Sequence, residues 1–180
     1  MANTEQDLSL ILGRRSIRTY QKKDIPAETI DLLLKAAMAA PSARAKDPWR
    51  FIVIRKCDTL RMLAEGLPNG KMLADAALGI AVCGDLNAAN DGQLSYLLQD
   101  CSAAIENLLL AVHALGLGAC WLGIHPREER MALLTGVLEL PAGVIPVCCI
   151  AIGYPAEQKE PRSRYNPRFV FFEKYGRQHG

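Results

Sequence analysis

Three arginines and a serine lie close together near the start of the chain, in the stretch GRRSIRTY over residues 13–20. A guanidinium group can donate two parallel hydrogen bonds to phosphate oxygens, and a hydroxyl adds a neutral donor. A second pair, Arg162 and Arg164, lies in the segment EPRSRYN. Both clusters could therefore hold an organic phosphate or an anionic ring. The alternative is that these arginines only solvate a helix end and a loop, since short basic runs are common. The first cluster consists of Arg14, Arg15, Ser16 and Arg18.

Motifs for other kinds of chemistry are absent from the sequence. The pattern GLGACWLG lacks the glycine spacing of a dinucleotide-binding fingerprint, and there is no GxxxxGK[ST], GxSxG or HExxH pattern. The six cysteines show neither CxxC spacing nor neighbouring histidines, which favours reduced core thiols over a metal site or disulfides. The sequence therefore predicts no metal site.

Length and composition indicate one globular domain over residues 1–180, because 50% of the residues are apolar and 22% are charged. The net charge of +2 is too small to indicate a nucleic-acid surface. The first residues, MANTEQDL, lack the features of a secretory signal, so we expect a cytoplasmic protein. The apolar stretch over residues 108–124 contains glycines and a histidine, which favours burial in protein over a membrane span.

Apolar periodicity predicts that helices and strands alternate along the chain. Helices are expected over residues 4–13, 26–40, 58–67, 93–115 and 126–136, and strands over residues 49–55, 78–84 and 144–155. The segment that begins at Gly118 is expected to be a strand or a loop. The arginine cluster follows directly after the first helix, and the loop APSARAKDP follows the second.

Two features predict contact with a second copy of the chain. The helix over residues 93–115 is apolar around nearly its whole circumference, and one small protomer can hardly cover such a helix on all sides. The polar tail, about residues 156–180, carries an apolar patch at residues 169–172, which suggests docking on its own body or on a neighbour.

Several separated segments resemble the nitroreductase family in order and spacing, over roughly residues 7–165. They are GRRSIRTY, AAPSARAKDPWRFIVI, DCSAAIENLLLAVHALGLGACWLGI, and AIGYP followed by PRSRY. The resemblance implies an α+β, three-layer sandwich with a mostly antiparallel sheet flanked by helices. It also implies an intertwined homodimer that binds two flavin mononucleotides (FMN) at the subunit interface, with the tail docking on the dimer partner.

The resemblance also implies which residues bind the cofactor. The RRSxR segment would contact the phosphate, ribityl chain and pyrimidine edge of the flavin, and the tail pair would complete the phosphate site. The loop residues would reach the flavin across the interface, and the WLG segment would pass beneath its ring. Trp121 could equally be a core aromatic residue. The implied set is Arg14, Arg15, Ser16, Arg18, Pro41, Ser42, Ala43, Asn69, Cys120, Trp121, Leu122, Gly123, Arg162 and Arg164.

The sequence departs from the family pattern PSxxNxQPW at two positions, where Ala45 and Asp47 replace amide side chains. The loss of two neutral donors bears on flavin edge contacts and on substrate preference. Asp47 is expected to be a solvated turn residue before Pro48.

The implied function is reduction of nitroaromatic, quinone or related small acceptors by NAD(P)H in a ping-pong cycle on bound FMN. Arg18 would stabilise the anionic reduced flavin, and no catalytic side chain is expected, because solvent can supply protons. Two alternatives are other flavin chemistry on the same fold, such as reductive dehalogenation or flavin fragmentation, and a noncatalytic protein that binds or senses flavin.

Overall fold

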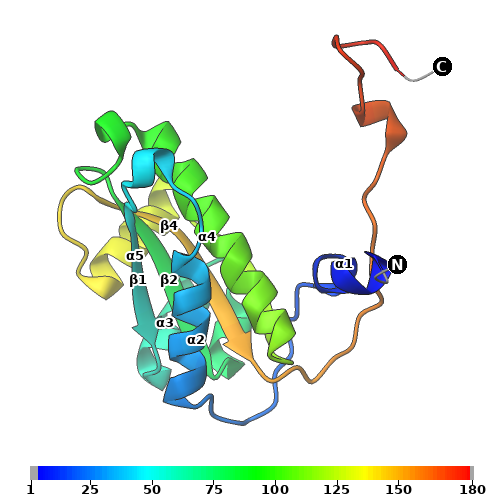
Figure 1. Cartoon of the computed structure of the whole chain (residues 1–180). Coiled ribbons are helices and arrows are strands. Elements are labelled where there is room, and N and C mark those ends of the chain that lie inside the picture. Colours follow the sequence, from blue (N-terminus) through cyan, green and yellow to red (C-terminus); the bar gives the residue numbers. More distant parts are fainter. Residues whose placement is uncertain (1–3, 179–180) are drawn as a thin grey trace.

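The computed structural model describes residues 4–178, and its centre is one antiparallel sheet of four strands (Figure 1). The strands are β1 (Trp49–Ile54), β2 (Leu78–Asp85), β3 (Gly118–Gly123) and β4 (Val144–Gly153), in the order β1-β2-β4-β3. All three pairings are antiparallel. The edge strands of the sheet are therefore β1 and β3.

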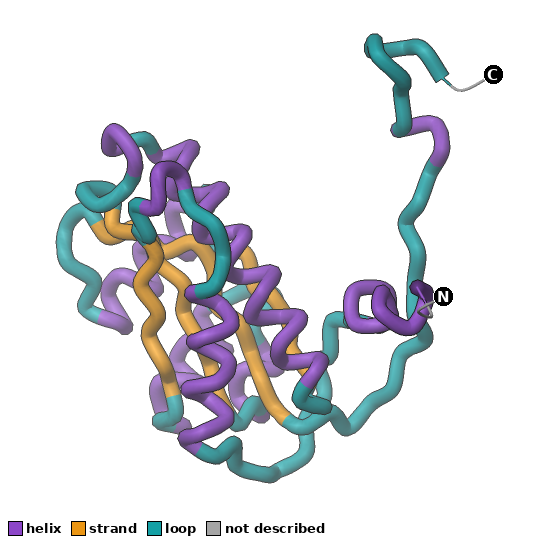
Figure 2. Tube along the Cα trace, viewed as in Figure 1, coloured by secondary structure: helices purple, strands orange, loops and turns teal. Residues whose placement is uncertain are grey.

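Helices cover both faces of the sheet, so the fold has three layers (Figure 2). One face packs against α2 (Ala27–Met38) and α4 (Leu94–Ala114), and the other packs against α3 (Cys57–Gly66) and α5 (Glu128–Leu138). The first helix is α1 (Thr4–Gly13), and short 3-10 helices are η1 (Ala43–Ala45), η2 (Lys71–Asp75), η3 (Asn90–Gly92) and η4 (Pro167–Phe169). This arrangement confirms the predicted α+β class with a mostly antiparallel sheet between helices.

Alternate residues of the central strands supply the two cores, because successive side chains of a strand point to opposite faces. On β4, Cys148 packs against α4 while Cys149 packs on the other face. All six cysteines are free, and only Cys57 is exposed. Burial raises the pKa of Cys149 to about 12. The predicted core thiols are therefore confirmed at five of the six positions.

The expected elements form with small differences at their ends. The segment that begins at Gly118 is a strand, β4 ends at Gly153, and α5 begins two residues later than expected. Within residues 4–178, no helix has the combination of length and hydropathy needed to cross a bilayer.

Helix α4 is buried on one side and leaves a stripe uncovered on the other. Its inner positions, Leu97, Cys101, Ala104, Ile105, Leu108 and Val112, are at most 1% exposed. The outer stripe includes Gln99 and Ser102, both exposed, and Glu106, which is partly exposed. The helix is thus less uniformly apolar than its composition suggests, and the described chain by itself does not cover this stripe.

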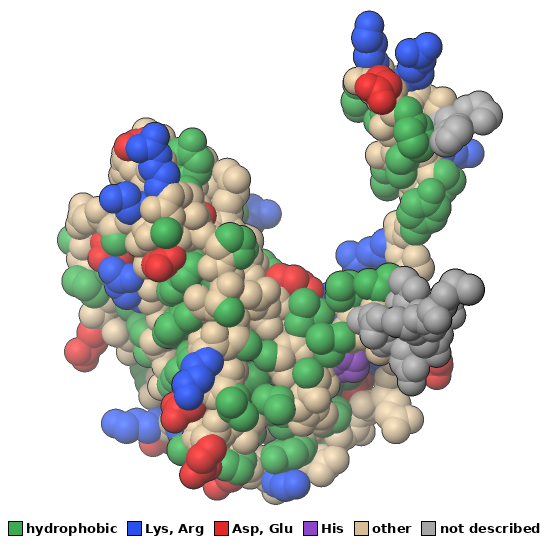
Figure 3. Space-filling model, in the orientation of Figure 1, with side chains coloured by type: hydrophobic (Ala, Val, Ile, Leu, Met, Phe, Trp, Pro, Cys, Tyr) green, Lys and Arg blue, Asp and Glu red, His purple; other side chains and the backbone are tan. Residues whose placement is uncertain are grey.

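Helix α1 and the tail form an arm that projects from the sandwich, with the tail passing close to α1 (Figure 1). Exposed apolar and aromatic side chains gather on this arm (Figure 3). Tyr165 is 75% exposed, Phe169 79% and Tyr175 93%. The tail therefore does not bury its aromatic residues against its own sandwich.

Candidate functional site

The segment that carries the first arginine cluster lies along the edge strand β3. Ser16 forms a parallel bridge with Ala119, and the Ile17 N–H donates to the Ala119 carbonyl over 2.9 Å. Ile17 is 8% exposed, so its side chain anchors the segment in the core. The arginines on either side are thereby held at one edge of the sheet.

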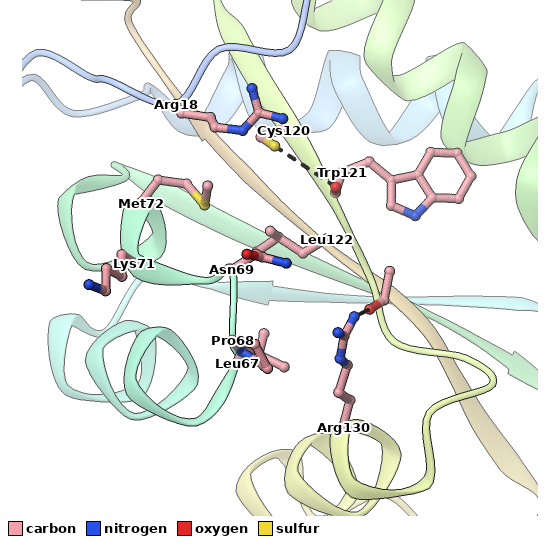
Figure 4. A pocket seen from close by; sticks show the side chains of 11 residues that line it. Arg18, Leu67, Pro68, Asn69, Lys71, Met72, Cys120, Trp121, Leu122 and Arg130 are labelled. Carbon is pink, nitrogen blue, oxygen red and sulfur yellow. Dashed lines mark hydrogen bonds between the residues drawn. The ribbon is translucent and has the colours of Figure 1, made fainter.

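The rest of the β3 edge is open and forms one wall of a groove of about 590 Å³ (Figure 4). Main-chain groups of alternate strand residues face the same side in an antiparallel ladder. The carbonyls of Ala119 and Gly123 accept from Ile17 and Arg130, so both face outward. The N–H and carbonyl of Trp121 must then face the open edge as well.

The groove gathers most of the predicted ring-binding residues. Asn69 lies on the opposite wall from β3, between the end of α3 and η2 (Figure 4). Trp121 is 37% exposed, so it is not a fully buried core residue. The groove is lined by Arg18, Leu67, Pro68, Asn69, Lys71, Met72, Cys120, Trp121, Leu122, Gly123 and Arg130.

A second pocket, of about 720 Å³, brings the two arginine clusters together. We call it the cationic pocket, and it adjoins the groove because Arg18 lines both. Its lining residues are Ile11, Leu12, Arg14, Arg15, Ser16, Arg18, Lys159, Arg162, Ser163, Arg164 and Tyr165. Residues nearly 150 positions apart in the sequence thus share one positively charged concavity.

Neighbouring groups orient the arginines of the first cluster. Arg14 Nε lies 3.2 Å from Glu106 Oε1 on α4, and Arg15 donates to the main-chain carbonyl of Glu160. The Arg18 side chain lies beside Cys120 (Figure 4). Burial raises the pKa of the Cys120 thiol, and the Arg18 guanidinium partly offsets this rise. Cys120 is therefore a neutral thiol at neutral pH.

Sequence reasoning missed two charged residues of the tail that contact the arginine segment. Glu157 Oε1 accepts from the main-chain N–H of Arg18 over 2.5 Å and from that of Thr19 over 3.2 Å. The hydrogen bond from Arg18 is the main cause that lowers the pKa of Glu157. Lys159 Nζ donates to the Ser16 carbonyl over 2.8 Å. Lys159 stands three residues before Arg162, so the basic run could have been extended to include it.

Two cations of the groove were also missed. Arg130 Nη1 donates to the Gly123 carbonyl over 2.8 Å, and Lys71 lines the same groove from η2. Arg130 lies in a helix that reads as an ordinary polar surface helix, so no local signal in the sequence marks it. Lys71 lies two residues after Asn69, at the start of η2.

The loop residues Pro41, Ser42 and Ala43 lie apart from the groove within one chain. Their loop precedes β1, at the opposite edge of the sheet from β3. Three strand spacings separate the two edges, which is about 14 Å. A single chain therefore does not bring the loop to the other predicted site residues.

Asp47 and Asp100 hold this loop in its conformation. The Ser42 hydroxyl donates to the Asp47 carboxylate and accepts from the Asp47 N–H over 3.0 Å, while the Ala43 N–H donates to Asp100 Oδ1 over 2.9 Å. Asp47 is exposed at a φ of 49°. Within one chain it is thus an exposed residue before Pro48 that engages the Ser42 hydroxyl.

Among residues 4–178, no three His, Cys, Asp or Glu side chains lie close enough together to bind a metal ion.

The chain matches the model of the nitroreductase family over residues 11–67 and 61–154. It is 42% identical, over 95% of its length and 99% of the relative, to an Archaeoglobus fulgidus protein with the provisional name NADH dehydrogenase/NAD(P)H nitroreductase.

Solved structures agree with this match. A crystal structure of a provisionally named NADH dehydrogenase/NAD(P)H nitroreductase from Parabacteroides distasonis superposes with a TM-score of 0.89 at 38% identity, over 94% of this chain and 99% of that one. A provisionally named nitroreductase from Desulfovibrio desulfuricans, solved in complex with FMN, gives a TM-score of 0.81 at 33% identity, over 93% of this chain and 96% of that one. With sequence, fold and match length in agreement, the chain belongs to the nitroreductase family.

Proposed function

We propose that this protein is an FMN-dependent oxidoreductase that takes reducing equivalents from NAD(P)H and passes them to small acceptors such as nitroaromatics or quinones. The observation that carries the proposal is the junction at Arg18 of a cationic pocket with an open groove. A phosphate at one end and a planar ring at the other match this pair of cavities in charge and shape. Family membership and the FMN complex of the Desulfovibrio desulfuricans relative support the same conclusion.

The residues of the site fit FMN by their chemistry. The pocket supplies guanidinium forks and a serine hydroxyl, which suit a phosphate monoester. Its cations come from both ends of the chain, including Arg14 and Arg164. The groove supplies outward-facing main-chain groups at Trp121 and the amide of Asn69, which suit the polar edge of a ring.

When bound, FMN supplies the hydride and electron chemistry that side chains lack. Arg18 places a fixed positive charge at the junction of phosphate pocket and ring groove, where it stabilises negative charge that develops during reduction. The open wall of the groove leaves room for donor and acceptor to bind in turn, which supports a ping-pong cycle. Solvent reaches this groove and can supply the protons.

We infer that the complete site needs two chains. The loop with Pro41, Ser42 and Ala43 lies at the far edge of the sheet, so it can cover the groove only from a second copy. The projecting arm and the exposed aromatic residues of the tail offer surface for such a homodimer (Figure 3). Because Asp47 engages the Ser42 hydroxyl, we expect this loop to contact the ring mainly through its main chain and Pro41.

The visible spectrum of the purified protein tests cofactor and activity together. A yellow protein whose flavin absorption bleaches on anaerobic addition of NADPH or NADH, and returns on addition of a quinone, supports the proposal. A colourless protein that binds no added FMN contradicts it. Bleaching without turnover of nitroaromatics or quinones favours another flavin reaction, and a yellow protein inert to both nicotinamides favours a noncatalytic flavin binder.

A further inference from the structure

The two ends of the chain meet in a short ladder beside the cationic pocket. Residues 16–21 run along residues 154–159, and we call these two segments the terminal clasp. Within it, the N–H of Ala156 donates to the Thr19 carbonyl over 2.9 Å, and Tyr20 forms an antiparallel bridge with Pro155. The clasp lies directly before the tail arginines, so its geometry sets where they can reach.

Several side chains link the two segments of the clasp: Gln21 Nε2 donates to the Pro155 carbonyl over 2.8 Å, and Glu157 makes the contacts closest to the arginines. A single carboxylate oxygen accepts from the main-chain N–H groups of Arg18 and Thr19 and lies 3.1 Å from Lys159 Nζ. The Glu157 side chain is 26% exposed, so water screens these contacts only in part. Hydrogen bonds to a charged acceptor are stronger than those between neutral groups.

Lys159 extends the same linkage into the pocket. Its ammonium donates to the Ser16 carbonyl over 2.8 Å, pairs with Glu157, and lines the cationic pocket. Glu157 therefore fixes the main chain of the arginine segment and one further cation of the pocket at the same time.

We propose that Glu157 is a positioning residue for phosphate binding, because it holds the cations from both ends of the chain at one site. The inference rests on the proposed FMN-binding function. Glu157 makes two opposite contributions to that binding. Its negative charge repels a phosphate, whereas its hydrogen bonds assemble the groups that bind the phosphate. If positioning dominates, removal of the side chain weakens FMN binding, although it makes the pocket more positive.

The experiment compares the affinities of FMN and of riboflavin, which has the same ring but no phosphate, by flavin fluorescence titration of the full chain. We expect Glu157→Ala to raise the Kd for FMN at least about tenfold, the scale of one lost charged hydrogen bond. The Kd for riboflavin should change less than about threefold, because Arg18 alone among the residues lining the groove belongs to the clasp. Glu157→Gln should fall between wild type and Glu157→Ala, since its amide oxygen can still accept from Arg18.

The matched control is Glu160→Ala. Glu160 lies in the same tail, and it contacts Arg15 through its main-chain carbonyl, so this variant removes the same charge and keeps that contact. It should bind FMN at least as tightly as wild type does, because it removes a negative charge and no positioning contact. Tighter FMN binding by Glu157→Ala, or an equal loss of affinity for FMN and riboflavin, overturns the inference. A wild-type chain that binds neither flavin overturns the proposed function itself, before any variant is compared.

Discussion

The contact between β3 and the arginine segment gives the sharpest prediction, which concerns Gly118→Ala. A Cβ atom at Gly118 would lie 2.7 Å from Cβ and Cγ2 of Ile17 and 2.9 Å from its Cγ1. The added Cβ at residue 118 and the Cβ of Ile17 are both bonded directly to the main chain, so rotation of the Ile17 side chain does not relieve the overlap between them. Ile17 must instead retreat by roughly 0.7 Å to restore an ordinary contact, and the neighbouring arginines move with it.

The cost of such overpacking is about 1–3 kcal/mol. The free protein can relieve the strain by moving the arginine segment outward, but FMN binding then has to pull it back. Since 1.4 kcal/mol corresponds to a tenfold change in affinity, we expect the Kd for FMN to rise roughly tenfold. Gly118 has no left-handed φ, so alanine adds no backbone penalty there.

Flavin fluorescence titration measures this change, and thermal unfolding of the same samples shows whether the chain still folds. Gly136→Ala in α5 is the control, because beyond the neighbouring residues and backbone of its own helix no atom lies within 4 Å of the added Cβ. This variant should bind FMN as wild type does and be slightly more stable, since alanine favours a helix over glycine. A Gly118→Ala variant with wild-type affinity for FMN would refute the reasoning.

Four further predictions follow from the site and its surroundings. Arg18→Ala and Arg164→Ala should lower FMN occupancy and turnover without changing the oligomeric state, and unchanged flavin retention in both would defeat their assignment. Tyr20→Phe should lower the free energy of unfolding by about 1–2 kcal/mol, because the buried hydroxyl shares its one proton between two main-chain carbonyls, at 2.7 and 3.1 Å. An unchanged denaturation midpoint would contradict this. In the native protein only Cys57 should react quickly with a thiol reagent, since burial raises the pKa of the other thiols, and a second fast thiol would be inconsistent with the packing. The pKa of Glu157 is lowered in the folded chain, so its contribution to stability should be present above about pH 4.3 and be lost as the pH falls through the lowered pKa. The difference in the free energy of unfolding between wild type and Glu157→Gln should therefore disappear in acid. A difference that stays constant into acid would argue against this contribution.

Local patterns in the sequence were enough to predict most of the elements. Apolar periodicity and turn residues act over a few positions, so the helices and the strands β1, β2 and β4 were expected close to where they lie. The four separated motifs, taken together, indicated the nitroreductase family. The arginine clusters were visible as composition, although composition alone left open whether they bind anything.

The tertiary structure decided how these parts combine. The strand order β1-β2-β4-β3 places the loop before β1 and the groove at β3 on opposite edges, and no local pattern contains that order. Strand pairing joins residues that are far apart in the chain. Bringing them together costs chain entropy, and only the packing of the whole fold offsets that cost.

The same reason explains which site residues were missed. Glu157, Lys159 and Arg130 look like ordinary surface charges in the sequence, because their partners lie on other elements: the arginine segment for the first two and the end of β3 for the third. The sequence by itself determined the residue types and the local structure of the site. The family resemblance implied that the two arginine clusters share one site, but only the folded chain decided which contacts bring them together, because these are hydrogen bonds across nearly 140 residues.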